Sequence, residues 1–173
     1  VRTAYQYKTM SYMAELAESL GKTADAAQYR EDMAKVYKAF NDTYYKPELK
    51  IYDTNFWRQI GQRTKYRQTS NIVPIVIGLA PEEVIDGVID NLVKDIIEKN
   101  YHLDTGIVGT KYILPLLTDY GYSDIAFKIL TQKDYPSWGY MMEESGVASW
   151  EMWENNTRSF DHYFLDTYDE WFF

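Results

Sequence analysis

A strongly apolar stretch, residues 81–97, constrains the fold of this chain more than any other part of it. Its aliphatic residues recur three and four positions apart, which is the spacing of an α-helix. Pro81 fits the first turn of such a helix, where a missing N–H costs nothing. The aliphatic residues cover more than one stripe of the helix: Val84, Ile85, Val88, Ile89, Leu92, Val93, Ile96 and Ile97. A helix of this kind is buried between neighbours, so the pattern predicts a fold of packed helices.

Other segments of the chain also carry helical patterns. Residues 10–20 and 23–40 predict a helical hairpin, in which Gly21 ends the first helix and Thr23 caps the second. Further helices are expected over residues 69–79, 123–130 and 159–173, with Ser123 as the cap of the second of these. Another is expected to begin at Asp104 or Thr105 as its cap, to bend near Pro115 and to end at residue 120.

Two stretches interrupt the helical patterns. Residues 44–67 are polar and aromatic and contain Pro47 and Gly61, which predicts a long connection in which short strands can form. Residues 136–146 are expected to be a loop or a short strand. No composition shift marks a domain boundary, so the sequence predicts one all-α unit over residues 1–173, with about seven helices in hairpin-like order.

The charge balance and residue usage exclude several classes of function. A formal net charge of −8 with no basic stripe argues against nucleic acid as a partner. The chain has no cysteine, so neither a disulfide nor a thiolate metal site can form. The acidic pairs lack metal-ligand spacing, and we infer neither a metal nor a cofactor. No apolar run approaches the roughly 18 residues of a membrane span.

The segment around residue 151 combines a carboxylate with aromatic rings. Glu151 lies between Trp150 and Trp153, and a Ser-Phe-Asp-His-Tyr run that contains His162 follows. Aromatic rings stack on the apolar faces of sugars, and a carboxylate can accept a proton from water. Each residue also has a plainer interpretation, because most glutamates are solvated or ion-paired, tryptophans are usually packed, and a lone histidine is weak evidence.

Several segments resemble the α-L-rhamnosidases of glycoside hydrolase family 78. The matching stretches are RQTSNIVPIVIGLAPEE (67–83), HLDTGIVGTKYILPLLTDYGYSDIAFKIL (102–130), YPSWGYM (135–141), WEMW (150–153) and SFDHYFLDTYDEWF (159–172). The resemblance implies a catalytic domain built as an (α/α)6 barrel of six helical hairpins. With about seven helices, this chain is similar to the C-terminal half of such a barrel, as a fragment of a longer polypeptide over residues 1–173.

The same resemblance implies hydrolysis of terminal α-L-rhamnosyl bonds with inversion, on rhamnose-containing glycans or glycosides. Glu151 matches the general base of the family, and His162 matches a histidine that contacts the sugar. Trp138, Trp150 and Trp153 are candidates for the aromatic lining of the substrate site. The acidic cluster that holds the family's general acid has no counterpart in these residues, which implies that the remainder of the parent polypeptide supplies it.

The chain departs from the family pattern just before the proposed base. Gly146 stands one residue closer to Trp150 than the family pattern places it. Three alternatives stay open on other grounds: a tetratricopeptide-like binding module, a carbohydrate-binding barrel relic without catalysis, and a helical-barrel glycosidase of different sugar specificity.

Overall fold

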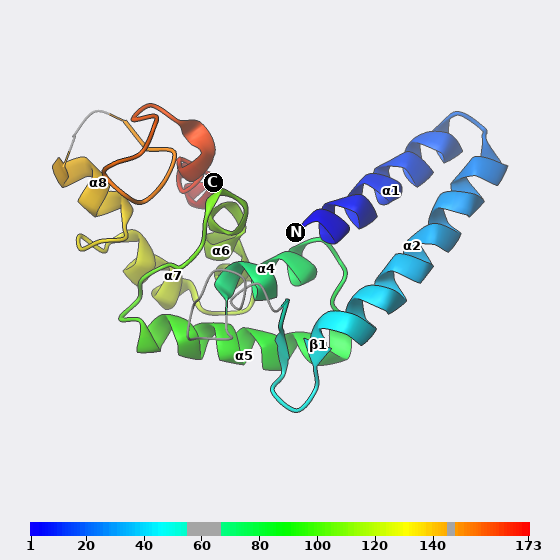
Figure 1. Cartoon of the computed structure of the whole chain (residues 1–173), viewed down its shortest axis with the longest axis horizontal. Helices are drawn as coiled ribbons and strands as arrows, with labels where there is room; N and C mark the ends of the chain where they lie inside the picture. The colour runs from blue at the N-terminus through cyan, green and yellow to red at the C-terminus, as the bar shows by residue number, and fades with distance from the viewer. Residues whose placement is uncertain (55–66, 145–147) are drawn as a thin grey trace.

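The computed structural model describes residues 1–54, 67–144 and 148–173 of the chain. A long helical hairpin projects from one side of the molecule, four helices form the middle, and the C-terminal segment folds against the far side (Figure 1). The hairpin consists of α1 (Arg2–Ser19) and α2 (Thr23–Tyr44). The regular secondary structure of the described residues is almost all helical, as the apolar periodicity predicts.

The turn of this hairpin follows the expected chemistry at its first helix end. Gly21 adopts a φ of 71°, which is favourable for a residue without a Cβ atom, and the N–H of Lys22 donates to the carbonyl of Ala17 at 2.8 Å. The caps expected at Thr23 and Ser123 are wrong. Each is instead the first residue of its helix, and neither helix has a side-chain cap.

A short two-stranded sheet follows the hairpin, within the predicted long connection. Strand β1 (Tyr45–Lys46) pairs antiparallel with β2 (Ile51–Tyr52). Tyr52 is fully buried, and its hydroxyl donates to Oδ1 of Asn41 at 2.7 Å. Its backbone N–H donates to Oδ1 of Asn71 at 2.8 Å. These bonds fasten the connection to both the hairpin and the central helices; residues 55–66 of the same connection lie outside the described residues.

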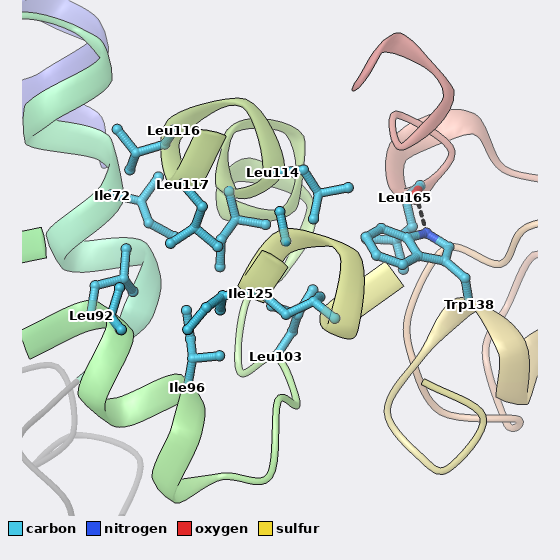
Figure 2. Close-up of a cluster of buried hydrophobic side chains, with 14 of the residues drawn as sticks. Ile72, Leu92, Ile96, Leu103, Leu114, Leu116, Leu117, Ile125, Trp138 and Leu165 are labelled. Atoms are coloured by element: carbon cyan, nitrogen blue, oxygen red, sulfur yellow. Dashed lines mark hydrogen bonds between the residues drawn. The ribbon is translucent and has the colours of Figure 1, made fainter. Parts of the chain in front are cut away.

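Four helices hold the main hydrophobic core: α4 (Gln68–Val76), α5 (Glu82–Glu98), α6 (Ile107–Asp119) and α7 (Ser123–Leu130). Helix α4 packs against both α5 and α6, and α6 packs against α7. Helix α5 buries most of its predicted apolar stripes, while Ile97 remains 47% exposed. Figure 2 shows side chains from these helices converging on one cluster that extends to the C-terminal segment. None of the described helices is long and apolar enough to cross a membrane.

Helix α8 (Trp138–Glu144) corrects the expectation of a loop or strand over residues 136–146. The hydroxyl of Ser137 accepts the backbone N–H of Tyr140 at 3.0 Å, which is the bond of a helix N-cap. Burial of Trp138 and Met141 supplies the packing that stabilises so short a helix.

The helix expected over residues 159–173 is also wrong. That segment contains two short 3-10 helices, η1 (Tyr163–Leu165) and η2 (Asp169–Phe172), joined by irregular backbone. Side chains accept local backbone N–H groups along it: His162 accepts from Phe164, Ser159 from Asp161, and Asp169 from Glu170. Such local bonds compete with the hydrogen bonds of an α-helix.

Candidate functional site

A cleft of about 610 Å³ lies where the C-terminal segment meets the loop before α6. Glu151 and Trp153 line it from the C-terminal segment, and Asp104 and Thr105 line it from the loop. Tyr135, Pro136, Arg67, Leu103, Gly106, Ile107, Met152, Glu154, Phe164 and Leu165 complete the lining. The cleft therefore combines carboxylates, a guanidinium group and aromatic rings, which are groups that can hold a polar ligand with apolar faces.

Glu151 is half-buried and its backbone is held in place. Its N–H donates to the carbonyl of Ser159 at 3.1 Å, and the N–H of His162 donates to the carbonyl of Ser149 at 2.8 Å. Two stretches of the C-terminal segment, residues 149–151 and 159–162, thus run side by side. This pairing holds the Glu151 backbone in a segment that has no regular secondary structure.

Trp153 is the tryptophan that both lines the cleft and anchors its wall. Its indole N–H donates to the carbonyl of Thr105 at 2.7 Å, and only 7% of the residue is exposed. Its ring meets the ring of Trp138 edge to face, with centroids 5.4 Å apart. The bond to Thr105 joins the Trp-Glu-Met-Trp segment to the loop before α6, which also lines the cleft.

Trp138 and Trp150 lie in the core. Trp138 is 2% exposed, and its indole N–H donates to the carbonyl of Leu165 at 2.7 Å (Figure 2). Trp150 is 1% exposed and packs edge to face with Tyr140 and Phe160. Neither residue is part of the cleft lining described above. In this arrangement both rings support the walls of the site.

His162 lies beside the Glu151 segment and outside the described lining of the cleft. Its Nδ1 atom accepts the backbone N–H of Phe164 at 3.3 Å, so the histidine acts as the N-cap of η1. The imidazole stacks on the ring of Tyr163, with centroids 5.5 Å apart. The structure therefore brings Glu151 and Trp153 together in one cleft and places His162, Trp138 and Trp150 around it.

Asp104 was predicted only as a possible helix cap, and that prediction is wrong. Helix α6 begins at Ile107 with Gly106 as its N-cap and without a side-chain cap. Asp104 instead accepts the backbone N–H of Gln68 at 3.1 Å and the ammonium of Lys99 at 2.9 Å. The signal for this arrangement was weak, because Gln68 lies 36 residues before Asp104 along the chain.

Tyr135 and Glu154 form a polar rim on the cleft. The hydroxyl of Tyr135 bonds the carboxylate of Glu154, and burial, followed by the negative charge of Glu154, raises the pKa of this tyrosine. The ring of Tyr135 also meets that of Tyr140 edge to face at 5.4 Å. The raised pKa keeps the Tyr135 hydroxyl protonated, as a donor to Glu154, into more alkaline solution than usual.

Close packing fixes the position of the loop before α6. A Cβ atom on Gly109 would lie 2.4 Å from Oγ1 of Thr69 and 2.9 Å from Cγ2 of Thr105. The hydroxyl of Thr105 also lies 2.8 Å from that of Thr110. Only glycine permits this approach of α4 and α6, which places the Thr105 carbonyl within reach of Trp153.

A larger cavity of about 710 Å³ lies between α1, α2 and α4. It shares Arg67 with the cleft, and Phe40, Tyr44 and Thr69 are among its other lining residues. None of the described residues that line it carries a carboxylate. It therefore lacks the acid–base groups that the smaller cleft contains. Within residues 1–54, 67–144 and 148–173, no group of three or more His, Cys, Asp or Glu side chains could hold a metal ion.

A mainly helical hairpin architecture and a cleft with a carboxylate beside tryptophan are features expected of the class of helical-hairpin glycosidases. A family model described as the bacterial alpha-L-rhamnosidase 6 hairpin glycosidase domain matches residues 1–173. The chain belongs to this family.

Curated relatives carry the same name. An alpha-L-rhamnosidase of Streptomyces avermitilis is 30% identical over 183 residues, which cover 100% of this chain and 16% of that protein. An alpha-L-rhamnosidase of Formosa agariphila is 33% identical over 98% of this chain and 18% of its own length. The chain thus spans less than a fifth of the relatives that it matches.

Solved structures support the fold. The structure of alpha-L-rhamnosidase from Dictyoglumus thermophilum matches with a TM-score of 0.84 and 38% identity, over 98% of this chain and 18% of that one. The Streptomyces avermitilis alpha-L-rhamnosidase complexed with L-rhamnose matches with a TM-score of 0.81 and 31% identity, over 98% and 16% of the two chains. The predicted partial six-hairpin fold is therefore confirmed.

Proposed function

We propose that this chain forms the C-terminal part of the catalytic domain of an α-L-rhamnosidase, which hydrolyses terminal α-L-rhamnosyl bonds in glycans or glycosides. One observation carries the proposal: the half-buried carboxylate of Glu151 lines the same cleft as Trp153, within the Trp-Glu-Met-Trp segment. Family membership and a neighbouring structure in complex with L-rhamnose add support.

In the proposed reaction Glu151 is the general base of an inverting hydrolysis. Its carboxylate accepts a proton from a water molecule, which attacks the anomeric carbon on the face opposite the leaving group. A carboxylic acid roughly 6.5–9.5 Å away protonates the leaving oxygen, so that the water fits between the two groups. Trp153 borders the sugar and holds the cleft wall through its bond to Thr105.

We propose further that the general acid lies outside residues 1–173, in the remainder of a longer polypeptide. The relatives that the chain matches are more than five times its length. Helix α1 supports a longer polypeptide as well, because Tyr12 and Leu16 on it and Leu20 at its C-cap are 54–64% exposed. Apolar side chains of this size usually pack against other elements.

A direct sugar contact for Trp138, Trp150 and His162 stays a prediction. Their packing favours an indirect role, in which Trp138 and Trp150 support Trp153 and the Glu151 segment. The binding alternatives are not favoured. A tetratricopeptide-like module does not account for a match to the rhamnosidase domain over the entire chain. The matched relatives are named alpha-L-rhamnosidases, which favours an enzyme over a non-catalytic barrel relic.

The proposal predicts a difference between the isolated chain and the full-length polypeptide. With p-nitrophenyl α-L-rhamnopyranoside, we expect turnover by the full-length polypeptide and none above background by the isolated residues 1–173, because a general base without its acid lacks half of the acid–base pair. The assay is release of p-nitrophenol, with circular dichroism to verify that both proteins are helical.

Two controls sharpen this experiment. The corresponding α-L-arabinofuranoside and β-D-glucoside should be hydrolysed far more slowly, since the site is proposed to select rhamnose. Equal rates for the isolated chain and the full-length polypeptide would contradict the placement of the acid outside these residues. Activity on the other aryl glycosides but not on the rhamnoside would contradict the proposal that α-L-rhamnosides are the substrates.

A further inference from the structure

Asp104 is a carboxylate on the wall of the Glu151 cleft that is held from behind by two donors. Its Oδ1 atom accepts the backbone N–H of Gln68 at 3.1 Å, and its Oδ2 atom accepts the ammonium of Lys99 at 2.9 Å. The Asp104 side chain is 21% exposed and lines the cleft together with Glu151 and Trp153. The carboxylate thus has a fixed direction and an open side.

Gln68 fixes the backbone of this loop as well as the carboxylate. It is fully buried, and its Oε1 atom accepts the backbone N–H of Asp104 at 2.9 Å. Its Nε2 atom donates to the carboxylate of Asp95 at 3.0 Å and to the carbonyl of His102 at 3.3 Å. Gln68 and Asp104 are therefore joined by two reciprocal hydrogen bonds. A third bond, from Gln68 to the carbonyl of His102, holds the loop just before Asp104.

The acceptor capacity of Asp104 is only partly used by these partners. Each carboxylate oxygen has two lone pairs and can accept about two hydrogen bonds. Gln68 and Lys99 use one on each oxygen. The remaining acceptor sites suit hydroxyl donors, and a hydrogen bond to a charged acceptor is stronger than one between neutral groups.

We propose that Asp104 binds the substrate, by accepting a hydrogen bond from at least one ring hydroxyl of the sugar in the Glu151 cleft. This inference rests on the proposed function and adds a second substrate-binding carboxylate to the lining of the cleft that contains Glu151. Gln68 and Lys99 are positioning residues, because they act on the sugar only through Asp104.

Asp95 provides a matched control for this role. It accepts the same Lys99 ammonium at 2.7 Å and the amide of Gln68 at 3.0 Å, and its side chain is 14% exposed. It is not among the residues that line the cleft. Replacing Asp95 therefore disturbs the same network without removing a group from the cleft.

The test compares Asp104→Asn and Asp95→Asn in the full-length polypeptide, with p-nitrophenyl α-L-rhamnopyranoside and its 2-, 3- and 4-deoxy analogues. We expect Asp104→Asn to raise KM by about 10- to 100-fold with a smaller change in kcat, because a charged hydrogen bond to bound substrate is lost. Asp95→Asn should change KM by less than about threefold. Isothermal calorimetry with L-rhamnose on a Glu151→Gln background measures binding without turnover.

The deoxy substrates separate a binding role from a structural one. The wild type should bind the analogue that lacks the bonded hydroxyl more weakly than the parent rhamnoside. The Asp104→Asn variant should bind that analogue and the parent rhamnoside almost equally, as in a double-mutant cycle. Asp104→Ser, which keeps an acceptor for the Gln68 N–H, replaces Asp104→Asn if the latter does not fold.

Each remaining outcome overturns a distinct claim. Equal effects of Asp104→Asn and Asp95→Asn, or additive losses with every deoxy analogue, would contradict substrate binding by Asp104 and leave the rhamnosidase proposal intact. A wild-type polypeptide that neither hydrolyses the rhamnoside nor binds L-rhamnose would overturn both proposals.

Discussion

Replacement of Glu151 by glutamine in the full-length polypeptide should lower kcat on p-nitrophenyl α-L-rhamnopyranoside by about 10²–10⁴-fold. Glutamine has nearly the shape of glutamate but cannot accept a proton from the attacking water. Because the side chain is half-buried and the Glu151 N–H bonds the Ser159 carbonyl through the backbone, the substitution leaves the local fold in place. KM should change little, since the loss is in the transition state.

Glu154→Gln is the matched control for this prediction. Glu154 lines the same cleft three residues further along, but it is exposed and its carboxylate bonds the hydroxyl of Tyr135. We expect its replacement to change kcat by less than about tenfold, below the roughly 10²–10⁴-fold loss expected for a general base. Equal losses for the two variants, or a larger loss at Glu154, would remove Glu151 from the role of general base.

Trp138→Ala should destabilise the chain by about 3–5 kcal/mol, the cost of removing a large aromatic side chain from a packed core. The ring is 2% exposed and contacts the rings of Trp153 and Tyr168. Its loss also leaves the carbonyl of Leu165 without the indole donor. Because Leu165 belongs to η1, we expect the C-terminal segment to loosen first. Urea unfolding followed by circular dichroism measures the change in the free energy of unfolding.

Two further variants divide this cost into packing and hydrogen bonding. Trp138→Phe keeps most of the ring but removes the indole N–H, so it should cost about 1–3 kcal/mol, the penalty of an unpaired buried carbonyl plus a smaller cavity. Tyr163→Ala, at a residue that is 73% exposed, should change stability by less than about 0.5 kcal/mol. Similar losses for Trp138→Ala and Tyr163→Ala would show that Trp138 does not anchor the segment.

Apolar residues at helical spacing, repeated over many positions, made the central helices predictable. The apolar stripes of α5 face several sides of the helix, so the helix must be buried on several sides. This can be predicted without knowing which helices pack against it. The helix end at Gly21 was equally predictable, because the left-handed backbone conformation that often follows a helix favours glycine. Both features depend only on nearby residues, which is why the periodicity and turn chemistry sufficed.

The C-terminal segment was harder to predict because distant partners determine its structure. The aromatic pattern of residues 159–173 suits a helix, yet His162 and Ser159 bond neighbouring backbone groups and the chain follows the surface of the core. Ser137 before helix α8 is a residue type that caps helices, and this could be recognised in the sequence. The stability of the helix, however, depends on the contact of Trp138 with Leu165 of η1. Short helices of this kind are fixed by tertiary contacts.

The candidate site divides in the same way. Glu151 and Trp153 were identified from their motif, and the structure places them in one cleft. Trp150 belongs to the same motif and Trp138 to the YPSWGYM stretch, but both are buried. Sequence cannot distinguish a ring that lines a cleft from one that supports it. Asp104 carried no motif role, since its partners Gln68 and Lys99 reach it only through the fold.

Proton NMR of the first sugar released by the full-length polypeptide tests the central claim most directly. If Glu151 activates water opposite the leaving group, hydrolysis of the α-L-rhamnoside inverts the anomeric carbon. The β-anomer of L-rhamnose should then appear first, with the α-anomer growing in only by mutarotation. Initial release of the α-anomer would mean retention through a covalent intermediate and would contradict the role of Glu151 as general base.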